Sequence, residues 1–227
     1  MAVPPVSNET FLREVDEELR RDQLLTFWQR YGRWLIAAIL LGLALFGAYL
    51  YWQHRQSVKA GEDGEKLQKA YASLGANRPA EAAKPLDELA TGSTPGYRAL
   101  AQFTQADVLL QRNDLKGAAA KFAAIAGNED FAPAFRDLAL IRQTMAEYDT
   151  LQPQQVIDRL RPMTAPGHPY LGSAGEMVAA AHLRAGRRDL AGRLFGQVAQ
   201  DENVPGSIRQ RAVQMAGLLG VDAIQQK

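Results

Sequence analysis

The side chains that could carry out catalysis or bind a metal are few and scattered in this sequence. Its three histidines are His54, His168 and His182. None has another histidine three or four residues away, the spacing that places two metal ligands on one helix face. The chain contains no cysteine, which excludes disulfides, a thiolate nucleophile and a cysteine-based zinc site. We therefore expect His182 to be a packing or surface residue rather than a ligand.

The short motifs that can indicate other chemistry are incomplete. The sequence has neither a phosphate-binding glycine loop nor a G-x-S-x-G nucleophile elbow. The stretch GSAG at 172–175 is typical of a flexible helix start, and the acidic pairs at 87–88 and 129–130 are typical of solvated or capping residues. We expect a protein without enzymatic activity, without a cofactor or metal, and without a small-molecule substrate.

The longest uninterrupted apolar stretch runs from Trp34 to Trp52 and contains no charged side chain. At about 1.5 Å per helical residue, its length is close to the roughly 30 Å of a bilayer's hydrocarbon core. A buried core helix of this length normally keeps a polar stripe, and a cleaved secretory signal starts nearer the N-terminus, with a basic segment. We predict a single transmembrane helix at 34–52. Aromatic residues suited to the membrane interface flank or close it at both ends: Trp28, Tyr31, Trp34, Tyr49, Tyr51 and Trp52.

The predicted span divides the chain into an N-terminal tail at 1–33, a juxtamembrane linker at 53–61, a repeat domain at 62–220 and a C-terminal tail at 221–227. In the tail, Phe11, Leu12, Val15 and Leu19 fall on one helical face, which either contacts lipid or a partner, or belongs to a solvated helix. Basic residues are balanced on the two sides of the span, so charge does not predict its orientation. The segment from Ala60 to the end is also balanced, with 19 basic and 19 acidic residues, so nucleic acid is not an expected partner.

The region after the span contains an internal repeat. Small and large apolar residues recur at steps of 36, 38 and 35 residues, which predicts stacked helical pairs because a small residue lets two helices approach and a large one fills the groove beside it. The third copy has drifted at Thr144 and Val156. The four register positions are occupied by Ala70, Ala106, Thr144 and Ala179; by Ala82, Ala118, Val156 and Ala191; by Leu86, Phe122, Leu160 and Phe195; and by Leu89, Ile125, Met163 and Val198.

Two of the copies, QADVLLQRNDLKGAAAKFAAIA and VAAAHLRAGRRDLAGRLFGQVA, resemble the tetratricopeptide repeat. In the fourth copy Gly186 stands at the turn position, and in the second Asn113 replaces this glycine, since asparagine also enters left-handed conformations. We therefore predict an all-α protein. It consists of an N-terminal helix, one transmembrane helix, and an α-solenoid of about four degenerate tetratricopeptide-like pairs closed by a helix between Pro205 and Gly220.

The order of these parts is more specific than the repeats. A charged tail ending in LLTFWQRYGRWLI, one span finishing in YLYWQ, and degenerate repeats resemble the YfgM-like family of ancillary subunits of the SecYEG translocon. The resemblance implies a single-pass protein of the bacterial inner membrane with a cytoplasmic N-terminus and a periplasmic repeat domain. It also implies the SecYEG translocon and a periplasmic chaperone or foldase as partners.

The first helix of each pair should line the concave face of such a solenoid, where a partner helix or unfolded segment would bind. On that face, we expect Leu67, Leu100 and Leu110 to bury against neighbouring helices, and Tyr71, Phe103, Met145 and Tyr148 to face a groove. A structural scaffold for a cell-envelope complex is the alternative function, and an enzyme with a spatially assembled site is the third. The face as a whole comprises Leu67, Tyr71, Leu100, Phe103, Asp107, Leu110, Ile141, Met145, Tyr148, Glu176 and Leu183.

Overall fold

The computed structural model describes the backbone of residues 8–223 and the side chains of residues 28–223. The apolar face predicted in the N-terminal tail, at Phe11, Leu12, Val15 and Leu19, therefore lies outside the described side chains, as does the end of the predicted C-terminal tail.

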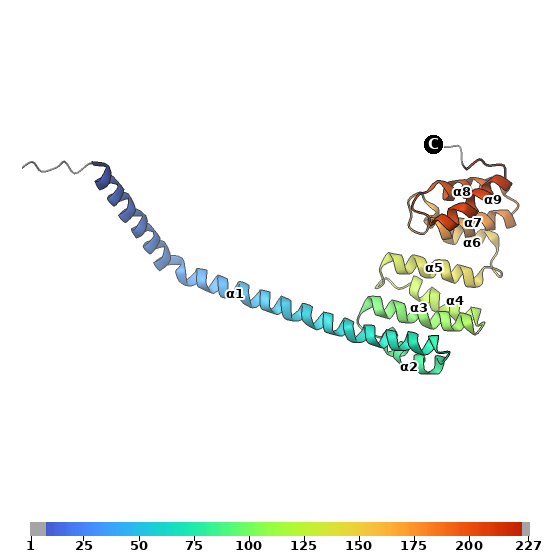
Figure 1. Ribbon diagram of the computed structural model, residues 1–227, viewed down its shortest axis with the longest axis horizontal. Helices are drawn as coiled ribbons and strands as arrows, with labels where there is room; N and C mark the ends of the chain where they lie inside the picture. Colours follow the sequence, from blue (N-terminus) through green and yellow to red (C-terminus); the bar gives the residue numbers. More distant parts are fainter. Residues whose placement is uncertain (1–7, 224–227) are drawn as a thin grey trace, which may run out of the picture. The chain divides into compact units, whose positions relative to one another are not determined.

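Within residues 8–223 the protein is helical and has no strand, which confirms the all-α prediction. Figure 1 shows the helices that follow α1 stacked in chain order. The elements are α1 (Asn8–Gly75), α2 (Pro79–Ala90), α3 (Pro95–Gln111), α4 (Leu115–Ala126), α5 (Pro133–Glu147), α6 (Pro153–Leu160), the 3₁₀ helix η1 (Arg161–Thr164), α7 (Leu171–Arg184), α8 (Arg188–Gln200) and α9 (Gly206–Leu218).

The chain forms two compact units, Met1–Lys59 and Ala60–Lys227. Helix α1 contributes to both, and residues 53–61, which we predicted to link the span to the repeats, continue this helix without a break. Several other helices begin with a proline in the first turn, where its missing N–H leaves no bond unmade.

The second unit contains four helical pairs and a closing helix, as the register predicts. The end of α1 pairs with α2, α3 with α4, α5 with α6, and α7 with α8, and α9 closes the stack. Four apolar clusters hold it together, and each joins one pair to the first helix that follows. Every one of the sixteen register residues is buried, the most exposed being Phe195 at 4%. The sequence period is therefore a packing period.

The turns inside the pairs also follow the prediction. Asn77, Asn113 and Gly186 occupy equivalent positions, and their φ angles of 57°, 61° and 73° are left-handed. Glycine and asparagine adopt this conformation more readily than other residues, so the predicted role of Asn113 is confirmed. The third copy has Leu151 at this position and enters α6 through the extended backbone of Gln152 instead.

The third copy also differs in its small register residue, Thr144, which is fully buried. Its hydroxyl donates a hydrogen bond of 2.7 Å to the carbonyl oxygen of Leu140, one turn earlier in α5. Because this bond satisfies the buried hydroxyl within its own helix, threonine fits where the other copies have alanine.

Candidate functional site

The first helix of a pair is joined to the first helix of the next pair, or to the closing helix α9, by side chains about one repeat apart. Arg142 Nη2 on α5 lies 2.6 Å from Asp107 Oδ1 on α3. On α9, Arg211 donates from Nε and Nη2 to the two oxygens of Glu176 on α7, at 3.0 and 2.7 Å. At the start of the stack, Tyr71 and Thr104 share a 3.5 Å hydrogen bond between α1 and α3.

The charges of these pairs respond to their surroundings. Burial raises the pKa of Asp107 above its ordinary value, and this effect outweighs the attraction and hydrogen bonding of Arg142, which lower it. The hydrogen bonds and charge of Glu176 raise the pKa of Arg211 above its ordinary value. Both pairs join helices of neighbouring repeats.

Between α5 and α7 the inner face is hollowed into a groove of about 410 Å³, which we call the α5–α7 groove. It contains three of the predicted partner-binding residues together with three that the sequence analysis did not select. The lining residues are Met145, Tyr148, Asp149, Glu176, Met177 and Ala180.

Arg184 fixes the position of Tyr148 at this groove. Its guanidinium carbon lies 5.0 Å from the centroid of the Tyr148 ring, and its two Nη atoms donate to the carbonyl oxygens of Tyr148 (2.9 Å) and Leu151 (3.2 Å). The first bond satisfies the carbonyl of the residue that caps the C-terminal end of α5, where a cation is also favoured, and the second satisfies a carbonyl in the turn that follows. Sequence reasoning missed Arg184, although its separation of 36 residues from Tyr148 is close to the repeat length.

Two predicted face residues are not on the surface. Phe103 is 6% exposed and Ile141 is 2% exposed, and the Phe103 ring lies 5.9 Å from that of Phe122. Each stands three residues before the buried register residue of its helix, Ala106 or Thr144, and residues three apart share a helix face. The expectation that Phe103 and Ile141 meet a partner is therefore wrong, since both belong to the core.

The other predicted positions divide between surface and core. Tyr71 is 42% exposed and Met145 is 60% exposed, while Leu67 is buried as expected. Leu110 and Leu183 are half-buried against the core. Leu100, which we expected to be buried, is 38% exposed.

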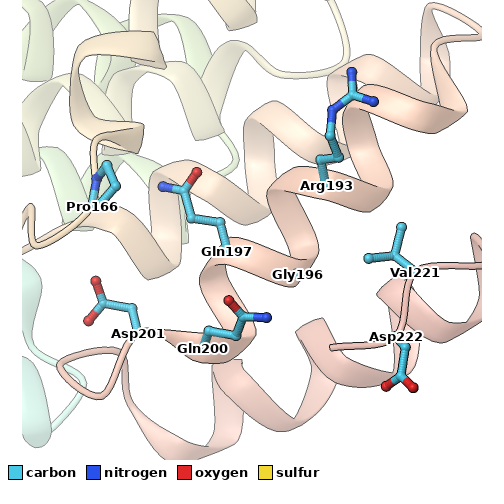
Figure 2. A pocket seen from close by; sticks show the side chains of 8 residues that line it. All are labelled: Pro166, Arg193, Gly196, Gln197, Gln200, Asp201, Val221 and Asp222. Atoms are coloured by element: carbon cyan, nitrogen blue, oxygen red, sulfur yellow. The ribbon is translucent and has the colours of Figure 1, made fainter. Parts of the chain in front are cut away.

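A second, larger hollow of about 520 Å³ lies on α8, the second helix of its pair. Figure 2 shows Arg193, Gln197 and Gln200 along α8, with Asp201 after its end. The Asp201 carboxylate accepts hydrogen bonds from the backbone N–H groups of Asn203 and Gly167, which lower its pKa. This acid therefore ties two loops together, and a structural role accounts for its environment.

The described residues 28–223 contain no group of three or more His, Cys, Asp or Glu side chains placed to hold a metal ion. His182 is half-buried on α7, and burial followed by the charge of Arg187 lowers its pKa. It is thus a neutral packing histidine at physiological pH.

Between residues 28 and 59, the first unit presents large apolar side chains outward. The six predicted membrane-interface residues are between 48% and 69% exposed. Within the described residues, α1 is the one helix long and apolar enough to cross a membrane, and none of its most apolar 18-residue window is buried inside the protein. The segment is therefore not a buried core helix.

The comparison with protein families matches residues 26–216 to a tetratricopeptide repeat-like domain. The matched region includes the apolar stretch of α1, all four helical pairs and most of α9. No curated protein and no solved structure matches the chain. Because the family match covers most of the chain and agrees with the buried register, the protein belongs to the tetratricopeptide repeat-like domain family.

Proposed function

We propose that this protein is a membrane-anchored module that binds other proteins through the inner face of its repeats. The observation that carries the proposal is the α5–α7 groove beside exposed Met145, on the face where stacked helical pairs generally bind partners. The match to the tetratricopeptide repeat-like domain family, whose stacked helices form extended binding surfaces, supports the same function.

The case for a membrane anchor rests on the cost of leaving α1 in water. Thirteen large apolar side chains between Trp34 and Trp52 are exposed. At about 1.5–3 kcal/mol for burying each, their transfer into lipid is favourable by on the order of 20 kcal/mol or more. The surface of a soluble monomer rarely presents so large a continuous apolar patch.

An anchor and a binding face make a useful combination. Tethering raises the effective concentration of the groove at the membrane, so that weak contacts with a nearby partner suffice. On the resemblance to the YfgM-like family, the anchor lies in the bacterial inner membrane with the repeats in the periplasm. The partners are then the SecYEG translocon, a periplasmic chaperone, or a protein emerging from the translocon.

Site-specific photo-crosslinking in intact cells tests this function. A photoreactive amino acid at Met145 should crosslink to translocon subunits, chaperones or secreted proteins, because this side chain is exposed on the inner face. The matched control places it at Lys84, which is exposed on α2, the second helix of its pair. Crosslinks only to proteins unrelated to secretion would exclude the translocon role, and equal crosslinking from Lys84 would exclude the inner face.

A further inference from the structure

We infer that the α5–α7 groove selects partner segments in which large apolar side chains stand next to a lysine or arginine. This inference rests on the proposed function, because it specifies the chemistry of the partner that binds the inner face. It follows from the floor of the groove, from its charges, and from the way its neighbouring arginines are already engaged.

The floor of the groove is apolar and adaptable. Met145 and Met177 contribute flexible thioether side chains, and Ala180 leaves room between them. Met145 is 60% exposed, so its apolar surface is available to a partner. Methionine-lined surfaces accept differently shaped apolar side chains because the unbranched chain repacks easily.

One wall of the groove is fixed while its floor can adapt. The Tyr148 ring is held by Arg184, which stacks on it and binds the carbonyl of the same residue. An aromatic ring held in this way offers contact area at little entropic cost. The volume of about 410 Å³ accommodates a few side chains and not a whole helix. An amphipathic segment would therefore insert one turn of apolar residues, with its polar side outside.

The charge of the lining favours a basic segment. Two of the six lining residues, Asp149 and Glu176, are acidic, and none is basic. Glu176 is engaged by Arg211 through both carboxylate oxygens. Asp149 is exposed, and no ion pair is found for it among the described side chains. A lysine or arginine of the partner would complement this carboxylate, whereas an acidic residue would be repelled.

The test uses two synthetic amphipathic peptides with identical apolar residues, one flanked by lysines and the other by glutamates. Their binding to the full-length protein in a neutral detergent is measured by fluorescence anisotropy. We expect the lysine peptide to bind about five- to tenfold more tightly, and this preference to shrink as salt is raised. Equal binding, tighter binding of the glutamate peptide, or binding of neither would overturn the inference.

Two pairs of variants place the binding in the groove. Asp149→Lys should remove or reverse the preference for the lysine peptide, while Glu129→Lys, on an exposed loop between α4 and α5, should leave it unchanged. Met145→Ser should weaken binding of both peptides about fivefold, since it removes apolar floor, and Leu218→Ser should not. All four positions are exposed, so the variants should fold.

Identical responses within either pair of variants would also overturn the inference. Its failure is separable from failure of the proposed function. If crosslinks from Met145 to secretion proteins persist while the peptides show no charge preference, the inner face binds partners by another chemistry. If those crosslinks are absent as well, the proposed function itself fails.

Discussion

At the scale of single residues, Asp201 shows how a half-buried acid can stabilise this fold. Its carboxylate accepts hydrogen bonds from the N–H of Asn203, at 2.9 Å, and from the N–H of Gly167, at 3.0 Å. The first bond shapes the loop after α8, and the second reaches the loop before α7, 34 residues earlier. Both bonds are stronger to the ionised form, which is why the pKa of Asp201 is lowered.

The lowered pKa predicts a pH-dependent effect of Asp201→Asn. An acid whose pKa is lower in the folded than in the unfolded protein stabilises the fold at pH values above its pKa in the unfolded chain, near 3.8. This contribution is lost as the pH falls through the lower pKa that the acid has in the folded protein. We expect Asp201→Asn to reduce the melting temperature at pH 7 and to have much less effect at about pH 2. Far-UV circular dichroism in detergent measures the melting temperature at each pH.

Asp149→Asn, on an exposed turn, is the control for this prediction. An equal loss of melting temperature at both pH values in Asp201→Asn would contradict it.

Arg184 gives a second prediction at this scale. Replacing it with alanine removes two hydrogen bonds to carbonyls and the contact with the Tyr148 ring. Because Arg184 is exposed and its partners remain accessible to water, we expect a loss of about 1 kcal/mol in the free energy of unfolding. Lysine should restore little of it, since it lacks the planar fork. Arg188→Ala, at an exposed position, is the control in urea denaturation, and an equal loss there would contradict a specific role for Arg184.

The limits of sequence reasoning are clearest for individual side chains. Met145, Tyr148 and Glu176 were predicted on the inner face and do line the groove. Phe103 and Ile141 were placed there too, because a repeat period identifies equivalent positions but does not say how far each helix is rotated toward its neighbours. A rotation of one residue, about 100°, is enough to move a side chain from surface to core.

At the scale of helices, close packing between α7 and α8 depends on a missing side chain. A Cβ atom added to Gly175 would lie 2.5 Å from Cγ2 of Val198. Val198 is fully buried and β-branched, so it cannot turn aside easily. Glycine is therefore required at this point of α7, although it is a poor helix former.

Opposite effects are expected from the same substitution at two glycines. Gly175→Ala should destabilise the protein by a net of up to about 2 kcal/mol, since overpacking at about 1–3 kcal/mol outweighs the gain of about 1 kcal/mol in helix propensity. Gly61→Ala should stabilise it by about 0.5–1 kcal/mol, because α1 is helical there and nothing lies within 4 Å of the added atom. Urea denaturation of the full-length variants measures both. Stabilisation by Gly175→Ala would show that Val198 can move.

The helices themselves were largely predictable from the sequence. The register residues, the left-handed Asn113 and the closing helix are each determined locally, by the spacing of small and large residues and by turn chemistry. The continuity of α1 through 53–61 was not foreseen as such. It follows from the absence of proline throughout α1 and from the isolated glycines, which weaken a helix without ending it.

At the scale of the whole molecule, α1 contributes to two units that distribute apolar side chains in opposite ways. The repeat unit has its apolar residues inside, in four clusters between helices. In its described side chains, residues 28–59, the first unit has them outside, over a stretch as long as a bilayer is thick. The two units therefore place apolar side chains in opposite ways, and we propose that lipid covers those of α1.

This proposal predicts that a charge in the middle of the apolar stretch will release the protein from the membrane. Leu43 is 61% exposed and lies near the centre of 34–52. A lysine there should cost about 2.5–3.5 kcal/mol of membrane insertion, so the fraction of Leu43→Lys recovered with membranes after alkaline extraction should fall. Leu218→Lys, at an exposed position on α9, adds the same charge to the repeat unit and should stay with the membranes. If the unaltered chain were extracted as readily as Leu43→Lys, another protein would have to cover this stretch, and the anchor would be a binding segment instead.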